Sequence, residues 1–158
     1  MKSTDERPNV IPWPPLLYAA AIALSVLLYY LWPTPWFIAP LDGMLMVIGI
    51  LLMLGALAID FSAMRAMKAA NTTIMATKGS DHLVTGGAFS LSRNPIYLAN
   101  TMLTIGAGLT FGIAWFILLA FIAAWLTQKL AIKREETHLE HRFGKAFRDY
   151  RKRVRRWI

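Results

Sequence analysis

The sequence contains no cysteine and little charge, and both shortages limit what the protein can be. Without cysteine there are no disulfide bonds, thiolate metal sites or cysteine nucleophiles. Only 16% of the 158 residues are charged, whereas 56% are hydrophobic and lie in long blocks. This apolar share is too high for one soluble domain of that length, and uncharged blocks of this kind indicate transmembrane helices.

Two common catalytic signatures are missing as well, because there is neither a Walker loop to cradle phosphate nor a convincing Ser-His-Asp arrangement. His138 and His141 are three residues apart, but only His82 could join them, so we expect no metal site. The first nine residues are polar, and no small-residue cleavage pattern closes the apolar block that follows. We interpret that block as a retained first helix and not as a signal peptide.

Four apolar segments are predicted to cross the membrane, which makes the chain an all-α, polytopic protein with a single membrane domain. The last two lie in an uncharged run of 33 residues from Ile96 to Gln128. One helix of that length would be about 50 Å long, against a hydrocarbon core of about 30 Å. Because Gly106, Gly108 and Gly112 mark the middle, we favour a hairpin over one long helix. The expected spans are 15–32, 44–61, 95–109 and 112–130, with a cytoplasmic loop over 62–94 and a cytoplasmic C-terminal helix over 131–156.

The basic residues favour four spans with both termini in the cytoplasm. Lys2 and Arg7 precede the first span, four basic residues lie in the 62–94 loop, and eleven follow from Lys129 onward. With four spans all seventeen lie on one side of the membrane, as the positive-inside rule expects, whereas with three spans the tail would oppose the other six. The alternative is an amphipathic re-entrant segment in place of two spans.

The 62–94 loop ends in a segment that suits an anionic ligand. Gly86 and Gly87 allow close approach of the backbone to a ligand, or simply form a turn. Asn94 can cap the next helix and Pro95 can occupy its first turn. That helix start presents free N–H groups and a positive dipole end beside Arg93, which suits a carboxylate or a phosphate. The alternative is a capped helix with a basic interfacial anchor.

The C-terminal segment has an apolar face and a basic face when it is drawn as a helix. This pattern predicts a basic amphipathic helix that lies on an anionic membrane surface, with a kink at Gly144. The apolar stripe consists of Leu139, Phe143, Phe147, Tyr150, Val154 and Trp157, and the basic face of Arg142, Lys145, Arg148, Arg151, Lys152, Arg155 and Arg156.

Carboxylates continue the apolar stripe toward the membrane, at Glu135 or Glu136. A carboxylate that faces inward near a bilayer is unfavourable and usually has a partner or a function. The simpler interpretation is an ion pair with Lys133, Arg134 or Arg93.

These segments together resemble the membrane methyltransferases of the isoprenylcysteine carboxyl methyltransferase and phospholipid methyltransferase superfamily. The resemblance rests on TGGAFSLSRNPIYL at 85–98, REETHL at 134–139, FGKAFRDY at 143–150 and VRRWI at 154–158. It covers about half of the chain, from Ser80 onward. It implies S-adenosyl-L-methionine as the methyl donor, bound between the cytoplasmic loop, the hairpin ends and the C-terminal helix, and a lipophilic acceptor that enters from the bilayer.

The chemistry of that donor suggests a role for each group. Arg93 and the helix start suit its carboxylate, and Glu135 or Glu136 suits its ammonium or a ribose hydroxyl, while aromatic rings could stack on adenine or meet the sulfonium. Methyl transfer is a direct displacement that needs alignment more than acid–base groups. The resemblance implies catalytic roles for Arg93, Asn94, Tyr97 and Glu136, and a donor site formed by Gly86, Gly87, Phe89, Arg93, Pro95, Tyr97, Glu135, Glu136, Leu139, Phe147 and Tyr150.

The sequence departs from the pattern of the prenylcysteine enzymes at three positions. Asn94 stands where those enzymes usually have His, Phe147 where Tyr is common, and Arg155 where a closing Pro is usual. These differences weaken the case for a prenylcysteine substrate. The acceptor stays open among a lipid amine, a lipid carboxylate, a small thiol and an isoprenoid-like molecule.

Two other functions compete with methyl transfer. Membrane reductases of the sterol-reductase type have a similar R-N-P-x-Y motif and use NADPH, but this chain is short for a dinucleotide and a sterol. The other is a non-catalytic membrane module that binds anionic lipid. The expected partners are a bilayer with anionic headgroups and a lipophilic acceptor, and we expect no nucleic acid.

Overall fold

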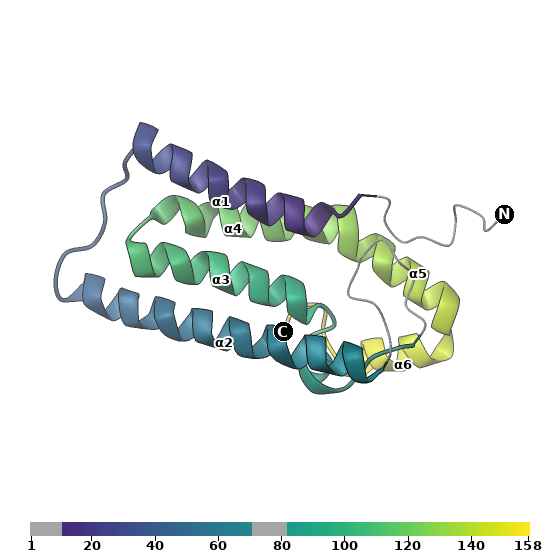
Figure 1. The fold of residues 1–158 in the computed structure, drawn as a ribbon. Coiled ribbons are helices and arrows are strands. Elements are labelled where there is room, and N and C mark those ends of the chain that lie inside the picture. Colours follow the sequence, from purple (N-terminus) through teal and green to yellow (C-terminus); the bar gives the residue numbers. More distant parts are fainter. Residues whose placement is uncertain (1–10, 71–81) are drawn as a thin grey trace.

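The computed structural model describes residues 11–70 and 82–158, and every regular element in this part of the chain is a helix (Figure 1). The predicted all-α fold class is therefore confirmed. The elements are α1 (Trp13–Leu31), α2 (Leu41–Ala69), the 3₁₀-helix η2 (Gly87–Ser90), α3 (Pro95–Phe111), α4 (Ala114–Thr127), the π-helix η3 (Gln128–Ile132), α5 (Lys133–Phe143) and α6 (Lys145–Arg153).

Three helical stretches in the described residues are long and apolar enough to cross a membrane, namely α1, α2 and the continuous run Ala114–Phe143. α3 is not among them, because it has only 17 residues, about 26 Å at the rise of an α-helix. Three spans therefore support a membrane protein, and a fourth crossing by α3 stays a prediction.

The uncharged run 96–128 folds as a hairpin, and not as one long helix. α3 begins at Pro95 and ends where Gly112 adopts a left-handed conformation with φ 70° and ψ 34°. The Ile113 N–H then donates to the Gly108 carbonyl at 2.9 Å. Glycine adopts such a conformation without steric strain. The expected turn is therefore confirmed, and α4 starts two residues after Gly112.

The helix that contains the second expected span is longer than that span. α2 continues to Ala69, past the expected end at residue 61, because residues 62–69 are mostly Ala, Met, Arg and Lys, which favour helix. Part of the predicted 62–94 loop is thus helical, and residues 71–81 of that loop lie outside the described residues.

The predicted single helix over 131–156 is broken in two. It separates into α5 and α6 at Gly144, whose φ is 51°, and it ends at Arg153. Val154 is extended, so the last five residues are not helical. The kink expected at Gly144 is confirmed, but the single apolar stripe is interrupted there.

The four long helices run alongside one another (Figure 1). The start of α1, the end of α2, the start of α3 and the end of α4 lie at one end, which we call the charged end, and α5 and α6 fold there. We call the opposite end, at Gly112, the turn end. α2 and α3 pack closely at Gly106, which has no side chain. A Cβ there would lie 2.6 Å from the Met53 Cγ atom and 2.8 Å from the Gly49 carbonyl oxygen.

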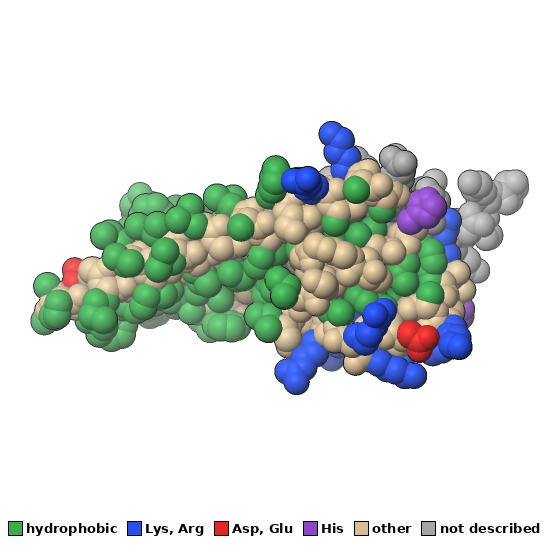
Figure 2. Space-filling model, turned by 90° about the horizontal axis from the view of Figure 1, so that it is seen from below, with side chains coloured by type: hydrophobic (Ala, Val, Ile, Leu, Met, Phe, Trp, Pro, Cys, Tyr) green, Lys and Arg blue, Asp and Glu red, His purple; other side chains and the backbone are tan. Residues whose placement is uncertain are grey.

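The surface of the molecule changes along its length. Hydrophobic side chains cover the bundle toward the turn end, whereas Lys and Arg side chains gather toward the charged end (Figure 2). Leu51, Leu54 and Leu57 on α2 are each more than half exposed, as lipid-facing residues of a membrane helix would be. After residue 140 the exposed basic side chains are Arg142, Lys145, Arg148, Arg151, Lys152, Arg153 and Arg155.

Candidate functional site

The last five residues of the chain fold back over the start of α3. We call residues 154–158 the C-terminal strap. The Arg93 N–H donates to the Arg155 carbonyl at 3.0 Å. The Arg156 carbonyl accepts from the Ser92 hydroxyl at 3.2 Å and from the Asn94 side-chain amide at 3.0 Å. These bonds bring together two segments that lie more than sixty residues apart in the sequence.

The strap carries Arg156 into an ion cluster with Glu136 and Arg93. Glu136 accepts two hydrogen bonds from Arg156, at 3.0 Å from Nε and 2.6 Å from Nη2. Its Oε1 atom also lies 3.1 Å from Nη2 of Arg93. We call this the Arg93–Glu136–Arg156 cluster. An ion pair with Arg93 was one of the interpretations left open for this carboxylate, and it is the one present.

The cluster is largely shielded from solvent, since the side chains of Arg93 and Glu136 are 9% and 12% exposed. Burial lowers the pKa of the Arg93 guanidinium, and the Glu136 carboxylate opposes that effect. The hydrogen bonds to Glu136 raise the pKa of Arg156. Nε and Nη1 of Arg93 are buried and have no hydrogen-bond partner among residues 11–70 and 82–158. Arg93 therefore keeps two unpaired donors inside the site.

Glu135 makes a different contact from that of its neighbour in the sequence. Its Oε1 atom accepts from the Tyr97 hydroxyl at 2.8 Å. Glu135 reaches the first turn of α3 and Glu136 reaches Arg93 just before it. Both carboxylates lie on α5, which η3 joins to α4 as one continuous helical path. Short π-helical segments inside α-helices are frequent at functional sites. The sequence left open which carboxylate faces the site, and both contact its walls.

The aromatic residues predicted to meet the donor fall into two groups. Phe147 and Tyr150 are almost fully buried, at 1% and 3% exposed, with their rings in edge-to-face contact. The Tyr150 hydroxyl donates to the Phe89 carbonyl at 2.6 Å, and burial raises the pKa of Tyr150 to about 12. These two rings pack α6 beneath the loop, whereas Phe89 and Tyr97 are half-buried.

The paired glycines serve the protein's own packing in this structure. Gly87 has a φ of 60°, and a Cβ there would lie 3.1 Å from the Ser62 hydroxyl oxygen on α2. The next residue, Ala88, donates its N–H to the same oxygen at 3.0 Å. Gly86 is exposed with open space around it. The close approach predicted at Gly87 is thus an approach to α2.

The structure brings the predicted residues together unevenly. Arg93 and Glu136 are in direct contact, Tyr97 contacts Glu135, and Asn94 is linked to them through the Arg156 carbonyl. Pro95 occupies the buried first position of α3, and Leu139 is half-buried on α5. Among the described residues, no group of three or more His, Cys, Asp or Glu side chains is arranged to hold a metal ion.

Sequence reasoning missed the roles of three contributors to this site. It placed Arg156 on the lipid-facing basic side, although Arg156 pairs with Glu136. It gave no individual role to Ser92. It placed Trp157 in the apolar stripe, whereas the Trp157 indole N–H donates to the Gln128 side-chain oxygen on η3 at 2.7 Å. The sequence held no specific signal for Arg156, because it is one of several arginines after Gly144.

Two comparisons relate this chain to known proteins. Residues 44–146 match a family model described as phospholipid methyltransferase. This range includes Arg93 and Glu136 and ends before the strap. An uncharacterized protein of Haemophilus influenzae is 39% identical over 54 residues, which are 29% of this chain and 86% of that protein.

Proposed function

Because the chain belongs to the phospholipid methyltransferase family, we propose that it transfers the methyl group of S-adenosyl-L-methionine to a lipophilic or small membrane-accessible acceptor. The donor binds at the charged end of the bundle, around the Arg93–Glu136–Arg156 cluster. The observation that carries this placement is Arg93, a buried cation with two unpaired donor nitrogens beside a carboxylate.

The residues of the cluster fit the polar end of the donor. Its carboxylate would accept from Nε and Nη1 of Arg93, since a buried charged donor without a partner is unfavourable. The N-terminus of α3, with Pro95 at its first position, adds a positive dipole end on the same side. The donor's ammonium would pair with Glu136, whose oxygens already accept from two arginines.

The rest of the donor would be held by groups next to the cluster. Glu135 and Tyr97 offer a carboxylate and a hydroxyl to the ribose or the ammonium. Phe89 is half-buried, so its ring is available for stacking on adenine or for a cation–π contact. Phe147 and Tyr150 are packed inside and would support this wall from behind.

Methyl transfer demands alignment from the protein. When bound, S-adenosyl-L-methionine supplies an electrophilic methyl group on a positively charged sulfur. The residues of the charged end would orient it and exclude water, and holding reactants in line accounts for a large part of the rate in such displacements. Arg93 and Glu136 therefore act as binding and orienting groups, and Asn94 holds the strap through the Arg156 carbonyl.

Ligand-dependent thermal stabilisation of the detergent-solubilised protein tests the donor. Binding to the native state raises the unfolding free energy by about 2.7 kcal/mol at a ligand concentration of 100 times Kd. We expect stabilisation by S-adenosyl-L-methionine and by its demethylated product, and none by NADPH. Stabilisation by NADPH alone would identify a reductase, and no response to any of the three would favour a lipid-binding module.

Two variants test the site assignment. Glu136→Gln and Arg93→Ala should abolish donor binding, while the helical content measured by circular dichroism is retained. Glu140→Gln is the matched control, because Glu140 forms an exposed ion pair with Arg151 on the neighbouring surface. If both site variants bind the donor with unchanged affinity, the assignment of the cluster is wrong.

We also propose that all four long helices cross the cytoplasmic membrane with both termini inside, which places the seventeen basic residues on one side. Because the native chain has no cysteine, single-cysteine variants can map this topology directly. A membrane-impermeant maleimide should label Phe37→Cys and Phe111→Cys from the outside and Lys152→Cys only from the inside. Outside labelling of Lys152→Cys would leave three crossings.

Anionic lipid is the partner that suits the exposed basic face of α6, and the attraction would be electrostatic only. Its apolar residues Phe147 and Tyr150 are buried against the protein, so they are not available to insert into the bilayer. Attraction of this type amounts to about 1 kcal/mol per basic residue near the surface and weakens with salt. Reconstitution in nanodiscs with and without anionic lipid, at two salt concentrations, measures it as a change in thermal stability.

A further inference from the structure

The C-terminal strap contacts the groups that would bind the amino-acid end of the donor. On Glu136 the Arg156 side chain reaches both oxygens, with Nε 3.0 Å from Oε1 and Nη2 2.6 Å from Oε2. At the start of α3 the Arg156 carbonyl accepts from the Ser92 hydroxyl and from the Asn94 side-chain amide. One strap residue therefore brings a positive group to the carboxylate and an oxygen acceptor to the two residues that flank Arg93.

This combination of groups is that of an amino acid. The donor carries an ammonium, which suits Glu136, and a carboxylate, which suits Arg93 and the donors beside it. Arg156 offers the same two kinds of group, one from its side chain and one from its backbone. A further cation at Glu136 would be repelled by the two arginines already there. Arg156 and a donor ammonium therefore compete for the same carboxylate.

Of the two arginines at Glu136, Arg156 is the one that can leave. Its side chain is 32% exposed, against 9% for Arg93. Arg93 lies just before α3, whereas Arg156 lies in the non-helical strap that follows α6. Among the described residues, Nε and Nη1 of Arg93 have no partner, so Arg93 can bind a carboxylate and still keep its contact with Glu136.

The strap is attached to the protein mainly by polar contacts, and none of its five residues is fully buried. Besides the contacts of Arg156, the Arg155 carbonyl accepts from the Arg93 N–H, and the Trp157 indole N–H donates to Gln128 on η3. Polar contacts can be exchanged for those of a polar ligand or of water with little net change in free energy. The strap can therefore detach without exposing a hydrophobic core.

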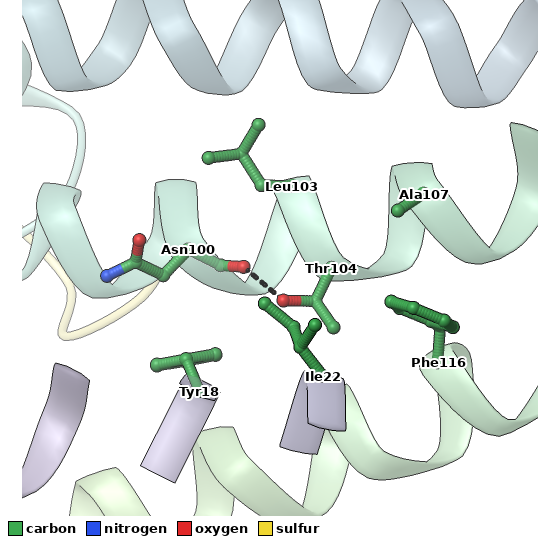
Figure 3. A pocket seen from close by; sticks show the side chains of 7 residues that line it. All are labelled: Tyr18, Ile22, Asn100, Leu103, Thr104, Ala107 and Phe116. Carbon is green, nitrogen blue, oxygen red and sulfur yellow. Dashed lines mark hydrogen bonds between the residues drawn. The ribbon is translucent and has the colours of Figure 1, made fainter. Parts of the chain in front are cut away.

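The cavity between α1, α3 and α4 offers the donor no alternative place (Figure 3). It measures about 130 Å³, whereas pockets for drug-sized ligands measure about 300–1,000 Å³. Its lining runs along α3 from Asn100 to Ala107 and includes no residue of the strap or of the Arg93–Glu136–Arg156 cluster. A donor bound to Arg93 and Glu136 would therefore take the place of the strap, and not lie in this cavity.

We infer that Arg156 is an internal substitute for the amino-acid end of the donor, and that the strap leaves Glu136 and the start of α3 when the donor binds. The inference rests on the proposed function and adds to it a competitor within the chain. The strap lies outside residues 44–146, which match the family model, so the competitor is a feature of this chain and not of the matched range. A closed strap lowers the apparent donor affinity in proportion to the fraction of open molecules.

The sign of the change in donor affinity tests the competition. Arg156→Ala should lower the Kd for S-adenosyl-L-methionine about tenfold, measured by calorimetry on the full chain in detergent, because the strap then stays open. Arg153→Ala is the matched control, since it removes the same charge from an exposed position outside the strap and should leave Kd unchanged. A weaker or equal affinity in Arg156→Ala would overturn the inference, because Arg156 would then be part of the donor site or irrelevant to it.

Trp157→Phe provides a second variant that changes no charge and leaves Glu136 paired. It removes only the hydrogen bond to Gln128, so it should also lower Kd, by a smaller factor than Arg156→Ala. This variant keeps the test valid if Arg156→Ala fails to fold. An affinity equal to or weaker than that of the wild type would contradict a strap that competes with the donor.

Movement of the strap can be measured with Arg156 in place. Because the chain has no cysteine, spin labels at Leu91→Cys and Ile158→Cys, two exposed positions, report the distance between the strap and the segment before α3. The demethylated product should lengthen this distance, whereas methylthioadenosine, which lacks the amino-acid end, should not. An unchanged distance in a sample that the product stabilises would overturn the inference and leave the proposed function standing. If neither the wild type nor Arg156→Ala binds the donor or its product, the proposed function is refuted and the inference with it.

Discussion

At the turn end of the bundle the chain passes from α3 to α4 through Gly112, whereas at the charged end Arg93, Glu136 and Arg156 join three separate segments. The loops of the turn end, residues 32–40 and 112–113, contain no charged residue. They are held by packing of Trp36 beside Gly112 and by the bond from the Trp115 indole N–H to the Trp32 carbonyl at 2.9 Å. The charged end is held instead by side chains that meet from distant parts of the sequence.

Because the two ends are held differently, the turn end should affect the stability of the fold, whereas the charged end should also affect donor binding. A turn closed by backbone conformation and packing has no unpaired charge to offer, so changes there should affect only the folded state. A buried cluster with unpaired donors on Arg93 can exchange its contacts with a charged ligand. Substitutions at the charged end should therefore change donor binding, and substitutions at the turn end should not.

The largest effect is expected for Glu136→Gln at the charged end. Removing the carboxylate leaves Arg93 and Arg156 facing each other without a counter-charge, and breaking a buried pair costs about 3–5 kcal/mol. Unfolding of the detergent-solubilised protein should show this loss. A variant that matches the wild type in both stability and donor binding would contradict the contrast between the ends.

Gly112→Ala should come next, as the corresponding change at the turn end. An L-residue in the left-handed conformation costs about 1–2 kcal/mol, and the added Cβ would lie 3.0 Å from the Trp36 ring. Thermal unfolding should show the loss, while donor-dependent stabilisation stays equal to that of the wild type. Gly43→Ala, which meets nothing within 4 Å, is the control.

Tyr150→Phe should lower stability by about 1 kcal/mol, because it removes the hydrogen bond to the Phe89 carbonyl. The folded pKa of Tyr150, about 12, lies above the ordinary value of 10.0. Its contribution to stability is therefore complete below about pH 10 and is lost as the pH rises toward 12. The unfolding free energy measured across that pH range should fall less steeply in Tyr150→Phe than in the wild type. Equal slopes would exclude this role for the buried hydroxyl.

The smallest effect is expected for Glu140→Gln, which breaks the exposed pair with Arg151. Exposed ion pairs contribute about 0.2–1 kcal/mol and are screened by salt. Urea unfolding at low and high salt should show a small difference at low salt only. A loss as large as that of Glu136→Gln would mean that burial does not distinguish the two pairs.

The features that could be read from the sequence are local ones. The apolar blocks, Pro95 at a helix start and Gly112 at a turn act within a few residues, and the hairpin follows from them. The pairing of Arg93 with Glu136 could be predicted as one of several alternatives, because both residues flank predicted spans. The strap was not, since a helix continued past Gly144 puts Arg156 on the polar face. The reversal at Gly144 and the bonds to Ser92 and Asn94 are tertiary contacts, which no periodicity encodes.

The π-helix η3 also constrains how the length of this chain can vary. Its wider turn acts as one extra residue inserted into the helix that runs from α4 into α5. Each residue of an α-helix rotates the following side chains by about 100°. Deletion of one residue from 128–132 would let the helix close as a regular α-helix with Glu135 and Glu136 still pointing toward Tyr97 and Arg93, whereas loss of a second residue would rotate both carboxylates away by about 100°. Insertions and deletions should therefore be tolerated in the loops of the turn end, whereas the path between α4 and the two carboxylates should tolerate the loss of one residue but not of two.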